Sequence, residues 1–131
     1  MRQIKYIVIH CTATDQKAKV SSIQRYWREN LKWKSPGYHK IVEPSGKVVT
    51  LATDDKICNG VAGHNSVCLH ISYIGGRLKD DRTPQQKASI ISEVKKWLQL
   101  YPNAEVLGHR DFAGVKKACP NFDVRTEYVS W

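Results

Sequence analysis

Two strongly β-forming segments constrain the fold more than any other feature of the chain. Residues 4–10 read IKYIVIH and residues 67–74 read VCLHISYI, and both runs are β-branched, apolar and of strand length. The second half of the first run is apolar on both faces, which is typical of a central strand. The sequence therefore predicts a sheet that contains both segments.

Two helices are predicted to accompany this sheet. The first should follow an N-cap at Ser21 or Ser22 and end before residues 35–37 (SPG). Its core-facing residues, chosen by helical spacing, are expected to be Ile23, Tyr26, Trp27 and Leu31. The second should begin at residues 83–86 (TPQQ), which combine a capping box with Pro at the first helical position, and end near Tyr101. Its core face is expected to be Ile91, Val94, Leu98 and Tyr101.

The remaining segments complete an α/β pattern. Residues 38–42 and 47–51 flank a Pro-Ser-Gly turn, which is a hairpin signature, and residues 105–108 form a short strand. The chain after residue 108 is expected to be mostly irregular. The order β-α-β-β-β-α-β predicts an α/β fold in a single domain, residues 1–131, with a mixed central β-sheet flanked by helices.

The chain is basic, and its charge is concentrated near its start. It has 131 residues, which suits one domain, and a formal net charge of +9; residues 1–40 hold nine basic and two acidic residues. Such a field attracts nucleic acid, an anionic membrane or an acidic cell-wall polymer, although a solvated surface is the simplest interpretation. No helix-turn-helix or zinc-finger pattern supports nucleic acid, and no apolar run reaches the roughly 18–20 residues of a membrane span. The first residues lack the pattern of a signal peptide, so we expect synthesis in the cytoplasm.

His10, His109 and Cys119 are candidate metal ligands because each lies at the end of a predicted strand or in the loop beyond it. Two imidazoles and a thiolate form a three-ligand zinc set that leaves a fourth position for water. The spacing is not specific by itself, since His10 could be a hydrogen-bonded strand-end residue and Cys119 a small buried one. The other cysteines form no CxxC motif; Cys58 and Cys68 could pair, but without a secretory signal we expect free thiols.

Five sequence blocks, which follow one another in a fixed order along the chain, favour the metal-ligand interpretation over the structural one. They are IVIHCTAT at 7–14, PGYHKIV at 36–42, HNS at 64–66, LGHRDF at 107–112 and KKACPNFD at 116–123. Together they span about residues 4–123 and resemble the zinc-dependent N-acetylmuramoyl-L-alanine amidases of the phage-lysozyme type, relatives of the peptidoglycan recognition proteins. The resemblance implies the amidase and peptidoglycan-recognition-protein fold.

The resemblance also implies a role for individual residues. The implied zinc ligands are His10, His109 and Cys119, and the implied catalytic residues are Tyr38 and Lys117. Lys116 competes with Lys117, because the interval from His109 to Cys119 is about two residues longer than in the closest phage pattern. Cys119 favours an enzyme, since binding-only members of the superfamily typically lack this ligand.

Four other polar residues lie near these blocks. His64 and Asn65 precede the second β-forming segment and are expected to line a substrate groove. His39 should point to the opposite strand face from Tyr38 and have a structural or supporting role. His70 lies in the middle of a predicted strand, where the family is usually more aliphatic, and its role stays open.

The implied activity is hydrolysis of the amide bond between N-acetylmuramic acid and L-alanine in peptidoglycan, by a monomer with one Zn²⁺ per chain. Zinc lowers the pKa of bound water and polarises a carbonyl, while Lys117 can stabilise the oxyanion and Tyr38 can orient water or donate a proton. A lone domain of this kind resembles a phage or prophage endolysin, which acts on the cell wall after release; a delivered toxin or a recycling enzyme would fit the same residues. The alternative function is a non-catalytic muropeptide-binding module of the recognition-protein class.

Overall fold

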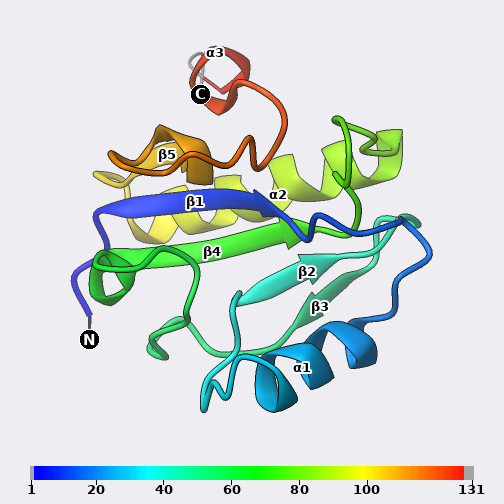
Figure 1. The fold of residues 1–131 in the computed structure, drawn as a ribbon. Helices are drawn as coiled ribbons and strands as arrows, with labels where there is room; N and C mark the ends of the chain where they lie inside the picture. Colours follow the sequence, from blue (N-terminus) through cyan, green and yellow to red (C-terminus); the bar gives the residue numbers. More distant parts are fainter. Residues whose placement is uncertain (1, 129–131) are drawn as a thin grey trace.

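The two β-forming segments lie side by side at the centre of a five-stranded sheet (Figure 1). The computed structural model describes residues 2–128. Strand β1 (Tyr6–Cys11) pairs in parallel with β4 (Cys68–Tyr73) on one side and with β5 (Glu105–Gly108) on the other. Every residue of β4 is buried, as is typical of a strand at the centre of a parallel sheet that is covered on both faces.

A hairpin completes the sheet. Strands β2 (Lys40–Val42) and β3 (Val48–Thr50) are antiparallel, and β2 adds in parallel to β4, so the strand order is β3-β2-β4-β1-β5. The predicted Pro-Ser-Gly turn joins them, with Gly46 at φ +92°, a conformation that glycine adopts at little cost. The predicted α/β fold with a mixed central sheet is therefore confirmed.

Helix α2 (Pro84–Leu100) packs against β2 and β4 and begins at the predicted capping box. Its most buried face differs from the expected one: Ile91, Leu98 and Tyr101 are only partly buried, and of the predicted face Val94 alone is fully enclosed. The apolar arc of this helix is wide, and two of its deepest side chains, Ile90 and Trp97, each lie one residue before the expected Ile91 and Leu98. The buried residues of α2 are Gln86, Ile90, Glu93, Val94 and Trp97.

Helix α1 (Val20–Glu29) lies beside the hairpin (Figure 1). It begins after Lys19 without a side-chain cap, so the predicted N-cap at Ser21 or Ser22 was wrong. Its apolar arc is divided between two environments. Ile23 and Trp27 pack on Ile41 and Ile74, as predicted, whereas Tyr26 and Leu31, also predicted to face the core, are 52% and 39% exposed.

The chain after β5 contains two short helices that the sequence did not predict. A 3-10 turn, η2 (His109–Asp111), follows β5 directly, and helix α3 (Val124–Glu127) packs back on β5. Arg82 fixes α3 through a two-pronged ion pair with Glu127, at 3.0 Å for both contacts. These few residues carry too little periodicity to be predicted as helices.

All four cysteines are free thiols, including Cys58 and Cys68, the pair considered from the sequence, which are both fully buried. A second 3-10 turn, η1 (Asn65–Val67), precedes β4. Among the described residues, no helix is long and apolar enough to cross a membrane.

Gln86→Leu should lower the free energy of unfolding by about 2–4 kcal/mol, because a buried amide that serves three backbone groups is lost. Gln86 donates to the carbonyls of Val42 and Ile74 and accepts from the Thr83 N–H. Urea denaturation measures the change. The matched control is Gln85→Leu at the exposed neighbouring position, which should change stability by less than about 0.5 kcal/mol. Equal effects would contradict the assigned role of Gln86.

Candidate active-site groove

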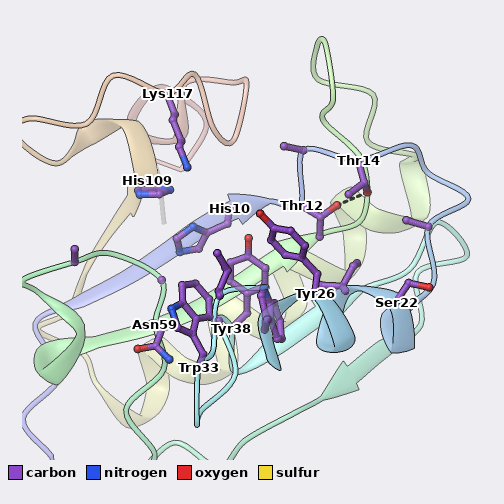
Figure 2. Close-up of a pocket in the computed structure, with 18 residues that line it drawn as sticks. His10, Thr12, Thr14, Ser22, Tyr26, Trp33, Tyr38, Asn59, His109 and Lys117 are labelled. Atoms are coloured by element: carbon purple, nitrogen blue, oxygen red, sulfur yellow. Dashed lines mark hydrogen bonds between the residues drawn. The ribbon is translucent and has the colours of Figure 1, made fainter. Parts of the chain in front are cut away.

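A groove of about 830 Å³ runs between α1, the end of β1 and the loops beyond β5 (Figure 2). In Figure 2, His10, His109 and Lys117 lie on one side of it, and Tyr26 and Ser22 project from α1 on the other. Much of the lining is apolar or aromatic, and the polar lining side chains besides the histidines include Thr12, Thr14, Ser22, Asn59 and Lys117. The apolar and aromatic lining side chains include Ile23, Tyr26, Trp27, Leu31, Trp33 and Tyr38.

Strand pairing brings the two predicted histidine ligands together. The parallel register of β1 and β5 sets Ile9 opposite Gly108, so His10 and His109 follow as neighbours. Their ring centroids are 4.9 Å apart. His10 is 1% exposed, whereas His109 is partly open to the groove.

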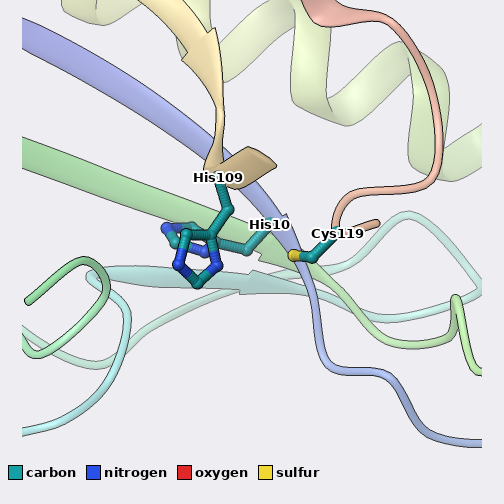
Figure 3. A group of neighbouring side chains, drawn as sticks. All are labelled: His10, His109 and Cys119. Carbon is teal, nitrogen blue, oxygen red and sulfur yellow. The ribbon is translucent and has the colours of Figure 1, made fainter. Parts of the chain in front are cut away.

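Cys119 reaches the same point through the loop after η2. The Arg110 N–H donates to the Cys119 carbonyl at 2.9 Å, and the Cys11 N–H donates to the Cys119 Sγ at 3.1 Å. As a result, one ligand atom from each of His10, His109 and Cys119 lies within 4.8 Å of the others (Figure 3). The structure thus brings together the three side chains that were predicted as metal ligands.

This donor set fits zinc. Two imidazole nitrogens and one sulfur are ligands that zinc prefers over the oxygen ligands of magnesium or calcium. A tetrahedral site with zinc–ligand distances of about 2.0–2.3 Å separates its donor atoms by roughly 3.3–3.7 Å. Small side-chain rotations are therefore enough to bring the three ligand atoms from their present spacing to this one. Three protein ligands leave one position for water or substrate, which is the pattern of a catalytic site.

The environment sets the protonation of the three side chains. Burial, followed by the neighbouring His70 and His109, lowers the pKa of His10 well below its ordinary value, and burial and Lys117 lower that of His109. Both rings are therefore neutral at pH 7, which is the form that binds a metal. The adjacent Cys11 side chain and burial raise the pKa of the Cys119 thiol, so its thiolate needs the charge of a bound cation.

Tyr38 lies beside His10, just before β2. The two ring centroids are 4.9 Å apart, and the Tyr38 hydroxyl donates to the Cys11 carbonyl at 3.3 Å. Its ring meets Trp27 edge-on at 5.3 Å. Burial, reinforced by Cys119 and Cys11, raises the pKa of Tyr38, so the hydroxyl stays protonated and can act as a donor.

Lys117 lines the groove and extends toward His109 (Figure 2). Its competitor, Lys116, is exposed and is not among the lining residues. The geometry therefore favours Lys117 as the lysine that faces a bound substrate.

His64 and Asn65 were expected to line the substrate groove, but the lining of this groove includes neither residue. His64 packs against Phe112, with ring centroids 5.0 Å apart. The Asn65 side chain turns inward to Val61 and His70. Residues 59–62 instead form this part of the wall, where Asn59, Gly60 and Ala62 line the groove.

The comparison with protein families identifies the chain. Residues 1–122 match the family described as N-acetylmuramoyl-L-alanine amidase. The chain belongs to this family, and the resemblance inferred from the five sequence blocks is confirmed. No curated protein sequence matches the chain significantly.

Solved structures share the fold across almost the whole chain. An endolysin of the Thermus scotoductus bacteriophage Ph2119 has a TM-score of 0.85 at 22% identity, covering 92% of this chain and 79% of its own. The N-acetylmuramoyl-L-alanine amidase LysC from Clostridium intestinale has a TM-score of 0.84 at 21% identity, covering 98% and 84%. Drosophila PGRP-LB, with a TM-score of 0.82 at 18% identity, covers 100% and 82%. The fold is thus that of the amidases and peptidoglycan recognition proteins.

Tyr26→Ala should change the free energy of unfolding by less than about 0.5 kcal/mol, because the ring faces the groove and not the core. The adjacent Trp27→Ala is the matched comparison and should cost about 3–5 kcal/mol, since Trp27 is buried against Ile23 and Ile41. Urea denaturation of both variants measures the difference. A large loss from Tyr26→Ala would mean that this face of α1 belongs to the core.

Proposed function

We propose that this amidase uses one Zn²⁺ per chain to hydrolyse the bond between the lactyl carbonyl of N-acetylmuramic acid and L-alanine in peptidoglycan. The observation that carries the proposal is the convergence of His10, His109 and Cys119 at the wall of a groove that also presents Tyr38 and Lys117. A monomer suffices, because every residue of the proposed site comes from one chain.

His10, His109 and Cys119 would hold the zinc ion. When bound, zinc supplies a Lewis acid that makes water a better nucleophile near pH 7 and polarises the scissile carbonyl. The protein's part is to keep the two imidazoles neutral by burial and to hold the sulfur with the Cys11 N–H.

Lys117 and Tyr38 supply the charge and the proton that amide hydrolysis needs. Lys117 approaches from the solvent side and stabilises the oxyanion that develops on the lactyl carbonyl. Tyr38 approaches from the hairpin side with a protonated hydroxyl, which can orient water or donate to the leaving nitrogen. The two side chains therefore act from different walls of the groove.

The basic charge of the chain and its structural likeness to a phage endolysin support an endolysin that acts on the cell wall after release. Its net charge of +9 favours approach to an anionic wall. The second candidate is a muropeptide-binding module without catalysis, and the presence of Cys119 in the cluster favours the enzyme.

Product analysis tests the proposed bond directly. Purified sacculi digested by the protein should gain amino-terminal alanine, with intact glycan strands and no new reducing ends. New reducing ends would indicate glycan cleavage, which usually needs two carboxyl groups at the scissile bond. Zinc-dependent binding of muropeptides without any product would favour the binding module.

Removal of the metal should abolish turnover, and Cys119→Ser should lower both zinc content and activity, because a hydroxyl is a poor substitute for a thiolate ligand. Metal analysis after dialysis should give one zinc per wild-type chain. Cys58→Ala is the matched control, because this buried thiol lies outside the cluster, and it should retain its zinc. Full zinc and full turnover in Cys119→Ser would exclude the proposed ligand set.

Lys117→Ala should keep its zinc but lose turnover by roughly 10²–10³-fold, as expected for removal of an oxyanion-stabilising group. Tyr38→Phe should have a milder effect of the same kind. Lys116→Ala is the neighbouring control and should stay close to wild type, because Lys116 does not line the groove. A larger loss of turnover in Lys116→Ala than in Lys117→Ala would show that Lys116, and not Lys117, stabilises the oxyanion.

A further inference from the structure

His70 is a fully buried histidine in the central strand β4 that the proposed chemistry does not use. The parallel register pairs His10 with Ser72, so His70 and His10 share one face of the sheet and are diagonal neighbours. The Nε2 of His10 lies 2.9 Å from the Nδ1 of His70. A polar ring at the centre of a sheet is costly unless its nitrogens are paired, so its hydrogen bonds indicate what it does.

The hydrogen bonds of Asn65 determine which nitrogen of His70 carries the proton. The Val61 N–H can only donate, and it lies 2.7 Å from the Asn65 side-chain oxygen. The same oxygen lies 3.0 Å from the Nε2 of His70, which must therefore donate a proton to it. A neutral His70 with its proton on Nε2 has a lone pair on Nδ1.

This lone pair determines the tautomer of His10. Two nitrogens 2.9 Å apart need one proton between them, and since the Nδ1 of His70 accepts, the Nε2 of His10 donates. The Nδ1 of His10 then carries a lone pair. No hydrogen bond within residues 2–128 occupies it, so it is available to a metal.

Two further contacts hold the His70 ring in place. The His39 ring stacks on the His70 ring with centroids 5.8 Å apart, and it is held there because its Nδ1 accepts from the backbone N–H of His70 at 3.0 Å. On the other side, the ring fills the space where a side chain at Gly60 would begin: a Cβ there would lie 2.3 Å from the Nδ1 of His70. Gly60 also lines the groove, so the wall of the groove is shaped around this ring.

We propose that His70, with its tautomer fixed by Asn65, is a positioning residue that holds His10 with the proton on Nε2 and presents Nδ1 to the metal. The inference rests on the proposed function, because it requires His10 to be a ligand. Metal-binding histidines generally donate their second N–H to a carboxylate, a carbonyl or water, and loss of such a partner typically weakens metal affinity by roughly 10–100-fold. Here a neutral imidazole takes that place, so the support adds no negative charge beside the ligand.

The wild-type protein provides the first test. In a long-range ¹H–¹⁵N spectrum of metal-free protein with labelled histidines, His10 should show a protonated Nε2 and an unprotonated Nδ1. Added zinc should shift Nδ1 of His10 and leave His70 in its Nε2-protonated form. A protonated Nδ1 on metal-free His10, or zinc bound at its Nε2, would overturn the proposal without any variant.

Zinc affinity, measured by competition with a chelating dye, provides the second test. His70→Leu removes the acceptor and should weaken zinc binding by roughly 10–100-fold. His70→Asn restores an acceptor oxygen near the position of Nδ1 and should recover most of that loss. The matched control is Leu69→Ala, which disturbs the adjacent buried residue on the opposite face and should leave zinc affinity within about threefold of wild type.

The outcomes separate this inference from the proposed function. If wild type binds zinc and releases alanine, but His70→Leu binds zinc as tightly, only the role of His70 is excluded. Equal losses in His70→Leu and Leu69→Ala would also exclude it, because the effect would then be general destabilisation of β4. If wild type binds no zinc, the proposed function itself fails.

Discussion

The placement of β1 between β4 and β5 is the constraint on which the rest of the structure depends. Both pairings are parallel, so the three strands end at the same edge of the sheet, and the register that sets Ile9 opposite Gly108 delivers His10 and His109 as neighbours. Because side chains alternate across a strand, a slip of one residue would send His10 into the face covered by α2. The strand core and the candidate metal centre are therefore determined by the same backbone hydrogen bonds.

The two faces of the sheet meet different requirements. On one face, α2 closes an apolar core around Ile90, Val94 and Trp97. On the other face, the short helix α1 covers only part of the sheet, and its apolar side chains are divided between the core and the groove. Buried polar rings are tolerated on this second face because hydrogen bonds pair them with one another, with the backbone and with the Asn65 side chain.

The sequence predicted those features whose signals are local. The central strands β1 and β4 were located to within two residues and the start of α2 correctly, because β-forming runs and a capping box are read from adjacent residues. The exposure of Tyr26 could not be read in this way, since helical spacing defines an apolar arc but not which part of it meets the core. The candidate ligands are far apart in the chain and emerged from the order of the motifs. The inward turn of Asn65 depends on Val61 and His70, contacts that no local pattern reveals.

The proposed site combines candidate metal ligands that the fold holds in place with one flexible charged side chain, that of Lys117. His10 is immobilised in a central strand, and the Cys119 loop is tied down on both sides, by the Arg110 N–H on the Cys119 carbonyl and by the buried Tyr73 hydroxyl on the Pro120 carbonyl at 2.7 Å. Lys116 and Lys117, which precede this loop segment, are by contrast exposed. Fixed ligands keep the ordering cost of metal binding low, because the sheet has already positioned them. An exposed lysine on a long, flexible stem can still follow a substrate carbonyl as charge develops on it, which a residue buried as deeply as His10 could not do.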